Sequence, residues 1–274
     1  MLRRYLIDGP HGSAIASGSL RHIASQYHPD RYYLHVQVDP DWRRRSFGSA
    51  MLDRLSAEAL ARKAELVRAE TRASCESDLA WYARRGFREV IRGWDARLDL
   101  ASFDPARFGD PAARAAAAGV AIAALDDVRA ADSGFLRRYH AAWDEAARGE
   151  PDADPVTPLS FSLWLAEEVD PPNAIPGGHL VALDGADIAG FCSIVRNLSE
   201  PGVVSHALTG VLARWRGRGI ATALTLAAIE RAIASGARRL DTYNDTRNAP
   251  MIAINTRLGF VQGDAIVTLQ RDLR

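Results

Sequence analysis

The sequence predicts an α/β fold made of two related units, and three observations support this prediction. A strand-like run, a turn rich in arginine, and a long helical pattern follow one another twice, over residues 32–60 and again over residues 203–232. A tryptophan opens each turn, at Trp42 and at Trp215. About 40 residues beyond each turn the chain reads Gly86-Phe87 and Gly259-Phe260. Elements that recur in the same order at similar spacing indicate an internal duplication.

The second turn, Trp215–Ala221, is the more informative of the two. It reads Trp-Arg-Gly-Arg-Gly-Ile-Ala and lies between the strand-like run 203–211 and a helical pattern that meets a stop signal at Gly236. A turn that opens a helix presents unpaired backbone N–H groups and the positive end of the helix dipole. Glycine lets an anion approach that backbone closely. The second turn is therefore expected to hold a phosphorylated cofactor.

The second half predicts a complete unit. Its expected elements are a strand at 120–125, helices over about 128–148 and 159–169, strands at 179–183, 187–195 and 203–211, the helix after the turn, a strand at 240–243, a helix over 250–258 and a strand at 265–269. The expected domain boundaries are 1–100 for the first unit, 101–118 for a linker whose alanine run could begin a short helix, and 119–274 for the second unit.

The first half is shorter. Strands are expected at 1–8, 13–24 and 31–38, followed by the first turn, Trp42–Gly48, and a helical run. Nothing in this half corresponds to the strand at 120–125 or to the two helices that follow it, so the first unit is predicted to be incomplete. Evolutionary loss and a start further upstream would both explain this.

The motifs of the second half resemble the GNAT-type N-acetyltransferase superfamily. From Arg216 to Ala221 the chain reads Arg-x-x-Gly-x-Ala, and from Asn248 to Phe260 it reads Asn-x-x-Met-x-x-x-Asn-x-x-Leu-Gly-Phe. Two such halves resemble the tandem members of the superfamily, of the mycothiol synthase type. The resemblance implies a mixed, largely antiparallel sheet in each unit, flanked by helices and containing a splayed parallel strand pair. It also implies an acyltransferase that uses acetyl-CoA.

The resemblance further implies where the cofactor is held. The pyrophosphate would meet the N–H groups around Arg218, Gly219 and Ala221, while the Arg216 and Arg218 side chains would add charge or hold the loop. The pantetheine arm would pair with the strand before the turn, beyond a bulge. The full expected cofactor set is Gly210, Val211, Arg216, Gly217, Arg218, Gly219, Ile220, Ala221, Asn244 and Asn248, with Asn248 as a helix N-cap. Ser46 occupies the position of Gly219 in the first turn, so the cofactor is expected in the C-terminal half and the first copy is expected to be structural.

Catalytic candidates divide between the halves. Many GNAT enzymes carry a tyrosine general acid five residues before the phenylalanine of Gly-Phe, which is Tyr82 in the first copy and Asn255 in the second. Asn255 is not an acid, but its amide can donate a hydrogen bond to the sulfur or the carbonyl. Tyr243 and His206 are the candidates for acid and base near the splayed strands. Tyr82, Tyr243 and His206 can equally be ordinary core or strand residues.

Charge and composition narrow the function classes. The chain has 34 Lys and Arg against 34 Asp and Glu, so no basic concentration predicts nucleic-acid binding. No apolar run is long enough to span a membrane. Only Cys75 and Cys192 are present, far apart, which favours a reducing cytoplasm, and Cys192 is expected to be a buried structural thiol. No metal ion is expected, and the oligomeric state stays open.

The acceptor is predicted only as a class. The segment between the two helices before residue 179 contains the acidic residues Asp144, Glu145, Glu150, Asp152 and Asp154, which would attract a cationic amine or would simply be solvated. The main hypothesis is transfer of an acetyl group to a primary amine of a small molecule by direct attack in a ternary complex. The alternatives are acetylation of protein N-termini or lysines, and a non-catalytic coenzyme A-binding sensor or pseudoenzyme. Aminoacyl transfer from tRNA is disfavoured by the neutral charge.

Overall fold

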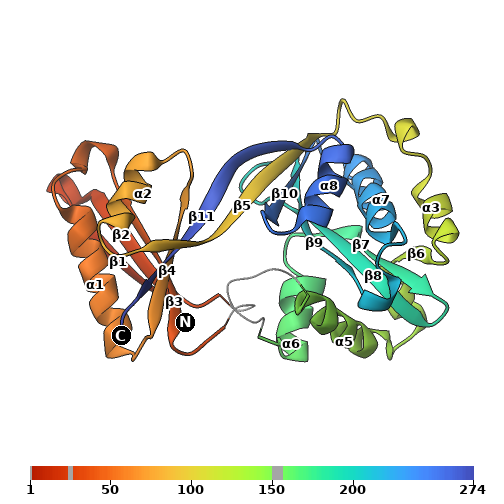
Figure 1. The fold of residues 1–274 in the computed structure, drawn as a ribbon, viewed down its shortest axis with the longest axis horizontal. Helices are drawn as coiled ribbons and strands as arrows, with labels where there is room; N and C mark the ends of the chain where they lie inside the picture. Colours follow the sequence, from red (N-terminus) through yellow and green to blue (C-terminus); the bar gives the residue numbers. More distant parts are fainter. Residues whose placement is uncertain (1, 24–26, 150–156) are drawn as a thin grey trace. The chain divides into compact units, whose positions relative to one another are not determined.

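The computed structural model describes residues 2–23, 27–149 and 157–274, and this chain forms two compact units (Figure 1). In the described part, the first unit holds residues up to 93 together with 157 and 264–274, and the second holds residues 94–149 and 158–263. Within the described residues, no helix combines the length and the apolar character needed to cross a bilayer.

The first unit is a mixed sheet with helices packed on it. Its elements are β1 (Leu2–Asp8), β2 (Ala14–Arg21), β3 (Arg31–Val38), α1 (Phe47–Ala61), β4 (Leu66–Arg72), α2 (Glu76–Ala83) and β5 (Arg88–Asp99). The strands are ordered β1-β2-β3-β4-β11-β5, where β11 is Val261–Asp272. Helix α1 buries Met51, Leu52, Leu55 and Ala59 at helical spacing against the sheet. This apolar stripe anchors the helix that follows the first turn.

The second unit has helices on both faces of its sheet. Its remaining elements are α3 (Pro111–Ala117), β6 (Ala121–Ala124), α4 (Leu125–Ala131), α5 (Phe135–Ala147), α6 (Phe161–Trp164), β7 (Ala174–Asp184), β8 (Asp187–Arg196), β9 (Val203–Val211), α7 (Ile220–Ala234), β10 (Arg239–Asp245) and α8 (Ala249–Arg257). The strands are ordered β5-β10-β9-β8-β7-β6. A Cβ on Gly190 would lie 3.3 Å from Leu224 of α7, and one on Gly210 would lie 2.9 Å from Ala146 of α5. Helices α7 and α5 therefore pack closely on β8 and β9.

Two predicted helices differ from the observed ones. The helix predicted over 128–148 is divided into α4 and α5, because the Asp132 carboxylate accepts a hydrogen bond from the Gly134 N–H at 2.8 Å and forms a local turn there. The helix predicted over 159–169 is α6 followed by a π-helical turn, Leu165–Val169. Such turns are rare and often occur at functional sites.

The compact units do not coincide with the predicted boundaries at residues 100 and 119. Strand β11, which the sequence analysis assigns to the second unit, pairs antiparallel with β4 from Ile266↔Arg72 to Asp272↔Leu66. Its backbone hydrogen bonds therefore complete the sheet of the first unit. Residues 101–118, expected to be a linker, belong to the second unit and contain α3, whose Ala115 is fully buried.

Each unit contains the expected pair of parallel strands, and in each unit the two strands pair over only a few residues before they separate. Strands β3 and β4 pair only from Arg31↔Leu66 to Tyr33↔Arg68. Strands β9 and β10 pair only from Val203↔Arg239 to Ser205↔Asp241. We call the point where β9 and β10 separate the fork.

A bulge distinguishes the second pair from the first. Ser193 of β8 pairs with Leu208, but Ile194 pairs with His206, which leaves Ala207 as an extra residue in β9. The corresponding register between β2 and β3 is continuous from Ala16↔Val38 to Arg21↔Tyr33. The bulge expected from the resemblance is thus present in the second unit.

Candidate functional site

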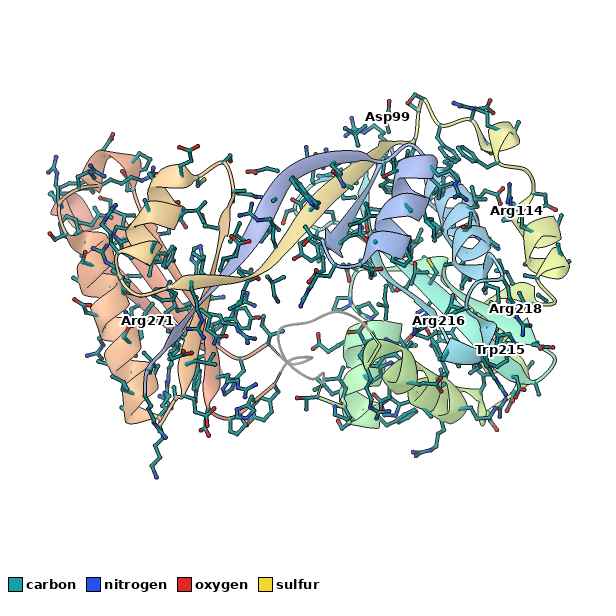
Figure 2. All side chains as sticks on the ribbon, viewed as in Figure 1. Asp99, Arg114, Trp215, Arg216, Arg218 and Arg271 are labelled. Atoms are coloured by element: carbon teal, nitrogen blue, oxygen red, sulfur yellow. The ribbon has the colours of Figure 1, made fainter. Side chains whose placement is uncertain are left out.

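The second turn leaves the start of α7 open. Gly217 and Gly219 have left-handed φ values of 77° and 85°, and a Cβ on either would meet no atom of the described residues within 4 Å. Gly219 is the N-cap of α7, and no side chain of the described residues caps the helix. Figure 2 labels Trp215, Arg216 and Arg218 of this turn. Arg216 Nε donates to the Val211 carbonyl at 3.0 Å, which ties the turn to β9. The free N–H groups of the first helical turn are therefore accessible to an anion.

The remaining residues expected at this turn have structural partners. Arg218 Nη2 donates to the Arg214 carbonyl at 3.3 Å, so both arginines that were expected to add charge or hold the loop contact its backbone. Ile220 is 1% exposed and belongs to the core under the turn. Trp215 is 3% exposed, with the Arg214 guanidinium 3.7 Å from its ring centroid. Packing of the tryptophan thus fixes the entrance to the turn.

The first turn adopts the same shape without glycine. Arg44 and Ser46 have φ values of 62° and 66°, at the positions of Gly217 and Gly219. Arg43 Nε donates to the Val38 carbonyl at 3.2 Å, as Arg216 does to Val211. A non-glycine residue in this region costs about 1 kcal/mol. The Ser46 substitution therefore leaves the backbone shape intact and adds a side chain at the opening of α1.

A cavity of about 220 Å³ lies at the fork, which we call the fork cavity. It is lined by Asp95, Arg97, Ser205, His206, Asp241 and Tyr243, among others. Ser205 and Asp241 are the last paired residues of β9 and β10, so the cavity begins where the strands separate. Tyr243 is 45% exposed. The structure thus brings the predicted acid and base candidates to one cavity.

His206 is held in a buried cluster beside the bulge. Its Nε2 atom lies 2.9 Å from Cys192 Sγ and 2.6 Å from Thr209 Oγ1, and its Nδ1 has no hydrogen-bond partner among the described residues. Burial lowers the pKa of His206 to about 4. The imidazole is therefore neutral at pH 7 and a weak base. Burial also raises the pKa of the Cys192 thiol to about 12, as expected for a structural thiol.

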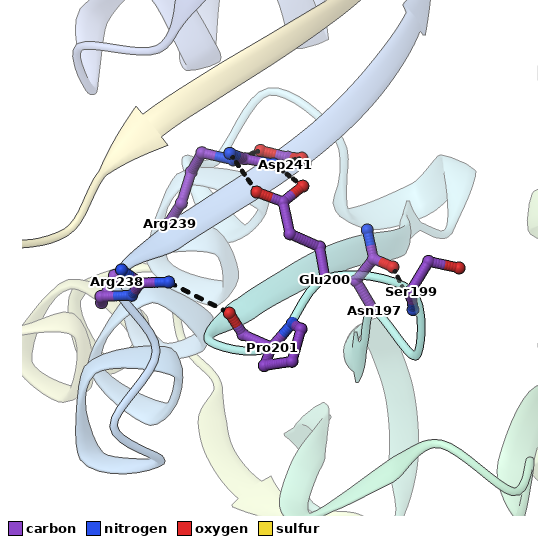
Figure 3. A network of polar contacts seen from close by, with 7 residues as sticks. All are labelled: Asn197, Ser199, Glu200, Pro201, Arg238, Arg239 and Asp241. Carbon is purple, nitrogen blue, oxygen red and sulfur yellow. Dashed lines mark hydrogen bonds and ion pairs between the residues drawn. The ribbon is translucent and has the colours of Figure 1, made fainter.

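An ion-pair network lies beside the fork cavity (Figure 3). Arg239 of β10 contacts Glu200, in the turn between β8 and β9, with its Nη1 and Nη2 atoms at 2.9 and 2.7 Å. Its Nε atom also lies 2.7 Å from the Asp241 carboxylate. Asp241 is therefore already ion-paired with a side chain of the same strand, which it shares with Glu200.

The α8 candidates lie against β10. Asn248 is the N-cap of α8 and its side chain accepts from the Met251 N–H at 3.4 Å, in agreement with the expected capping role. Asn255 is 3% exposed, and neither its Oδ1 nor its Nδ2 has a partner among the described residues. Asn255 and Asn244 line a cavity of about 10 Å³, roughly the space of one water molecule. The amide at the position of the usual tyrosine is thus enclosed and unsatisfied.

Gly210 and Val211 lie at the end of β9. A Cβ on Gly210 would approach Phe191 Cζ to 2.6 Å, so glycine is required there by packing. Val211 pairs with Gly190 of β8, which places its backbone next to the turn. Both residues therefore occupy the strand segment beyond the bulge, as expected.

The first unit contains a larger cavity, of about 770 Å³. It is lined by the first turn, by the ends of β3 and β4, and by Cys75, Trp81 and Tyr82 of the α2 region. Tyr82 is 5% exposed, and burial raises its pKa to about 12. The sequence analysis identified Tyr82 and the first turn, but the cavity between them depends on how α2 packs.

The acidic segment predicted to attract the acceptor is only partly described. Glu150, Asp152 and Asp154 lie outside the described residues, while Asp144 lies 3.9 Å from Arg148 and Glu145 is exposed. The prediction for this segment therefore stays untested.

Comparison with known proteins identifies the family of both units. The model described as "Acetyltransferase (GNAT) family" matches residues 137–260, and the model described as "Acetyltransferase (GNAT) domain" matches residues 7–89. The chain belongs to the GNAT acetyltransferase family. It is a tandem GNAT protein, because each unit matches separately, and it is an N-acetyltransferase by family.

The chain is similar to a curated relative and to two solved structures, one of which is named a tandem GNAT protein. A mycothiol acetyltransferase from Actinosynnema mirum is 29% identical over 233 residues, which cover 85% of this chain and 72% of the relative. A GCN5-related N-acetyltransferase from Sphaerobacter thermophilus has a TM-score of 0.77 and 23% identity, covering 99% of this chain and 81% of that one. A tandem GNAT protein from the clavulanic acid biosynthesis pathway also has a TM-score of 0.77, with 21% identity over 100% of this chain and 83% of that one. These two structures support the fold.

Proposed function

We propose that this GNAT protein transfers an acetyl group from acetyl-CoA to a primary amine of a small molecule, with the cofactor held by the C-terminal half. The observation that carries the proposal is the open start of α7, where Gly217 and Gly219 hold left-handed φ values with free space above them. A pyrophosphate fits such a site because unpaired N–H groups and the helix dipole both favour an anion.

The strand before the turn suits the rest of the cofactor. Beyond the bulge at Ala207 and the separation from β10, the edge of β9 offers backbone groups to the amide-bearing pantetheine arm. When bound there, acetyl-CoA supplies a thioester that an amine can attack directly. Gly210 and Val211 would orient the arm, and the second turn would fix its phosphate end.

We further propose roles for the polar groups near the fork. Tyr243 of the fork cavity is the donor that would stabilise the departing thiolate, whose ordinary pKa is already near 8.5, whereas the enclosed Asn255 amide lines a separate cavity with room for about one water molecule. His206, being neutral, would position the amine by a hydrogen bond at Nδ1 rather than hold a proton. Tyr82 lines the cavity of the first unit, so it would serve as a donor only if that unit binds the cofactor.

The preference for a small acceptor has one further support. The relative from Actinosynnema mirum is named a mycothiol acetyltransferase, which favours a small-molecule acceptor over a protein. We therefore propose a compact amine as the substrate class. A coenzyme A sensor without catalysis is the alternative, motivated by the asparagine at position 255.

Calorimetric titration of acetyl-CoA into wild type, Gly219→Asp and Ser46→Asp tests the proposal. We expect one site that is lost in Gly219→Asp and kept in Ser46→Asp, because a carboxylate at residue 219 would repel the pyrophosphate. No binding to wild type, or loss only in Ser46→Asp, would overturn the C-terminal assignment. Binding with no turnover on a broad amine panel would favour the sensor.

A further inference from the structure

The cavity of about 770 Å³ in the first unit, which we call the first-unit cavity, has the size of a ligand site. Its volume falls within the range of typical small-molecule pockets, about 300 to 1,000 Å³. The first turn, the ends of β3 and β4, and α2 supply most of its lining. The cofactor proposed above occupies the second unit and leaves the first-unit cavity without a ligand.

The lining of the first-unit cavity carries an excess of positive charge. Among the described residues it includes five guanidinium groups, those of Arg43, Arg44, Arg72, Arg84 and Arg85, and two carboxylates, those of Glu70 and Asp78. A neutral or cationic ligand would leave this excess unmatched, whereas an anion would reduce it. The composition of the lining therefore favours an anionic ligand.

One of these charges lies at the start of α1, where a cation is unfavourable. Arg85 Nη2 donates to the hydroxyl of Ser49, the third residue of α1, at 2.6 Å. Its Cζ atom lies 4.1 Å from the Trp81 ring centroid, and its Nη1 donates to the Trp81 carbonyl at 3.0 Å. The start of a helix is the positive end of its dipole and attracts anions. In the part of the chain that the structure describes, Arg85 has no carboxylate partner and the first turn of α1 has no acidic residue.

The opening of α1 offers further donors beside this charge. Ser46 is the N-cap and is exposed, and no side chain of the described residues caps the helix. The N–H groups of the first helical turn and the Ser46 hydroxyl can therefore donate to an oxyanion. A terminal phosphate has three acceptor oxygens and a charge of about −1.5 to −2, which suits the guanidinium and the helix dipole together. A bridging pyrophosphate would meet the Ser46 side chain where Gly219 leaves open space in the second turn.

The second unit has an apolar residue where the first unit has Arg85. Gly259 aligns with Gly86, so Leu258 occupies the position of Arg85. The cation at the helix start is therefore particular to the first unit. The two turns share a backbone shape, but the chemistry beside them differs.

Tyr82 provides a further contact in the same cavity. It is 5% exposed and lines the cavity. Its hydroxyl has no hydrogen-bond partner among the described residues, and the oxygen is not sealed from solvent. Burial raises the pKa of Tyr82 to about 12, so the hydroxyl keeps its proton at pH 7 and can donate it to a ligand oxygen in a hydrogen bond.

We propose that the first-unit cavity binds a phosphorylated small molecule other than the cofactor, with its phosphate at the start of α1 beside Arg85 and another polar group at Tyr82. This inference is independent of the acetyl transfer proposed for the second unit. A sugar phosphate and a nucleoside monophosphate both present the required terminal phosphate, and the experiment distinguishes them.

Calorimetric titration of phosphorylated probes into the full chain saturated with coenzyme A tests this inference. The probes are glucose 6-phosphate, adenosine monophosphate and inorganic phosphate, with glucose and adenosine as the unphosphorylated counterparts. We expect glucose 6-phosphate or adenosine monophosphate to bind at least about tenfold more tightly than its counterpart, and the tighter of the two identifies the source of the phosphate.

Three variants separate the contacts. Arg85→Gln should weaken every phosphate probe about tenfold, and Ser46→Ala should weaken them about threefold. Ser46 is exposed, so Ser46→Ala decides the test if Arg85→Gln folds poorly. Tyr82→Phe should weaken the organic phosphates about threefold and leave the Kd of inorganic phosphate unchanged.

Arg54→Gln is the matched control, because Arg54 belongs to α1 but lies over the Tyr5 ring and does not line the cavity. It should change the Kd of each probe by less than about twofold. The inference is overturned if no phosphorylated probe binds more tightly than its counterpart, or if Arg85→Gln and Arg54→Gln behave alike. It is also overturned if further coenzyme A displaces the bound phosphate, since the first-unit cavity would then be a cofactor site.

Discussion

Replacing His206 with asparagine should reduce the loss of folding stability that acid causes. Burial holds the pKa of His206 near 4 in the folded chain, whereas an unfolded histidine titrates near 6.5. Below pH 6.5 the unfolded state therefore binds a proton that the folded state does not. The contribution of His206 to the free energy of unfolding is therefore fully present above pH 6.5 and is lost as the pH falls toward 4.

The magnitude follows from the two pKa values. Between pH 7.5 and pH 5, one histidine with these values lowers the free energy of unfolding by about 2 kcal/mol. His179 has a similar pKa of about 4 and remains in the variant, so it serves as an internal reference. From these two histidines wild type should lose about 4 kcal/mol over this interval and His206→Asn about 2 kcal/mol. The asparagine also loses contacts with Cys192 and Thr209, so the pH dependence is compared and not the absolute stability.

Urea unfolding at pH 7.5 and pH 5.0, followed by tryptophan fluorescence, measures this difference. NMR of the imidazole Cε1–H signals provides a direct check, since the His206 signal should not titrate above pH 5. Equal acid losses in wild type and His206→Asn would refute the reasoning. A His206 signal that titrates near pH 6.5 would refute it as well.

Three further predictions concern single positions. Gly219→Ser should lower the free energy of unfolding by about 1 kcal/mol, because residue 219 has a left-handed φ, and it should also weaken acetyl-CoA binding. Ser46→Gly should relieve a similar backbone strain, partly offset by the greater entropy of glycine in the unfolded chain. Equal calorimetric affinities of Gly219→Ser and wild type for acetyl-CoA would contradict this prediction. Leu224→Ala, at a fully buried site in α7, should lower the free energy of unfolding measured in urea by about 3 kcal/mol. A loss below 1 kcal/mol would mean that neighbouring side chains move into the cavity left by Leu224. Asn255→Leu should raise stability by about 1 kcal/mol, because neither amide atom has a partner among the residues that the structure describes; a lower unfolding midpoint would show that the amide is satisfied.

The second turn illustrates what local sequence can predict. Glycines at 217 and 219, a strand before them and an apolar helical pattern after them act within a few residues of one another, and the structure has the expected open helix start. The Asn248 cap follows from the same kind of local chemistry. In the first turn Ser46 keeps the left-handed conformation despite its cost, so the sequence did not reveal that both turns share one backbone shape.

Glu168 illustrates what sequence reasoning missed. In the sequence it is one of several glutamates near a helix end, with no motif around it. In the structure the π-helical turn Leu165–Val169 places it on the lining of a cavity of about 230 Å³ together with Ser193, a residue 25 positions later in the chain. No local pattern predicts that an acid in such a turn will line a cavity.

The sequence by itself determined the duplication, both turns and most strands and helices, because these depend on residue spacing over short stretches. Only the tertiary structure decided three other features: the membership of β11 in the first unit, the bulge at Ala207, and the cavity at Glu168. Each depends on hydrogen bonds or packing between segments far apart in the chain. The register of a strand is set by its partner, and the charge balance of a cavity is set by every element that encloses it.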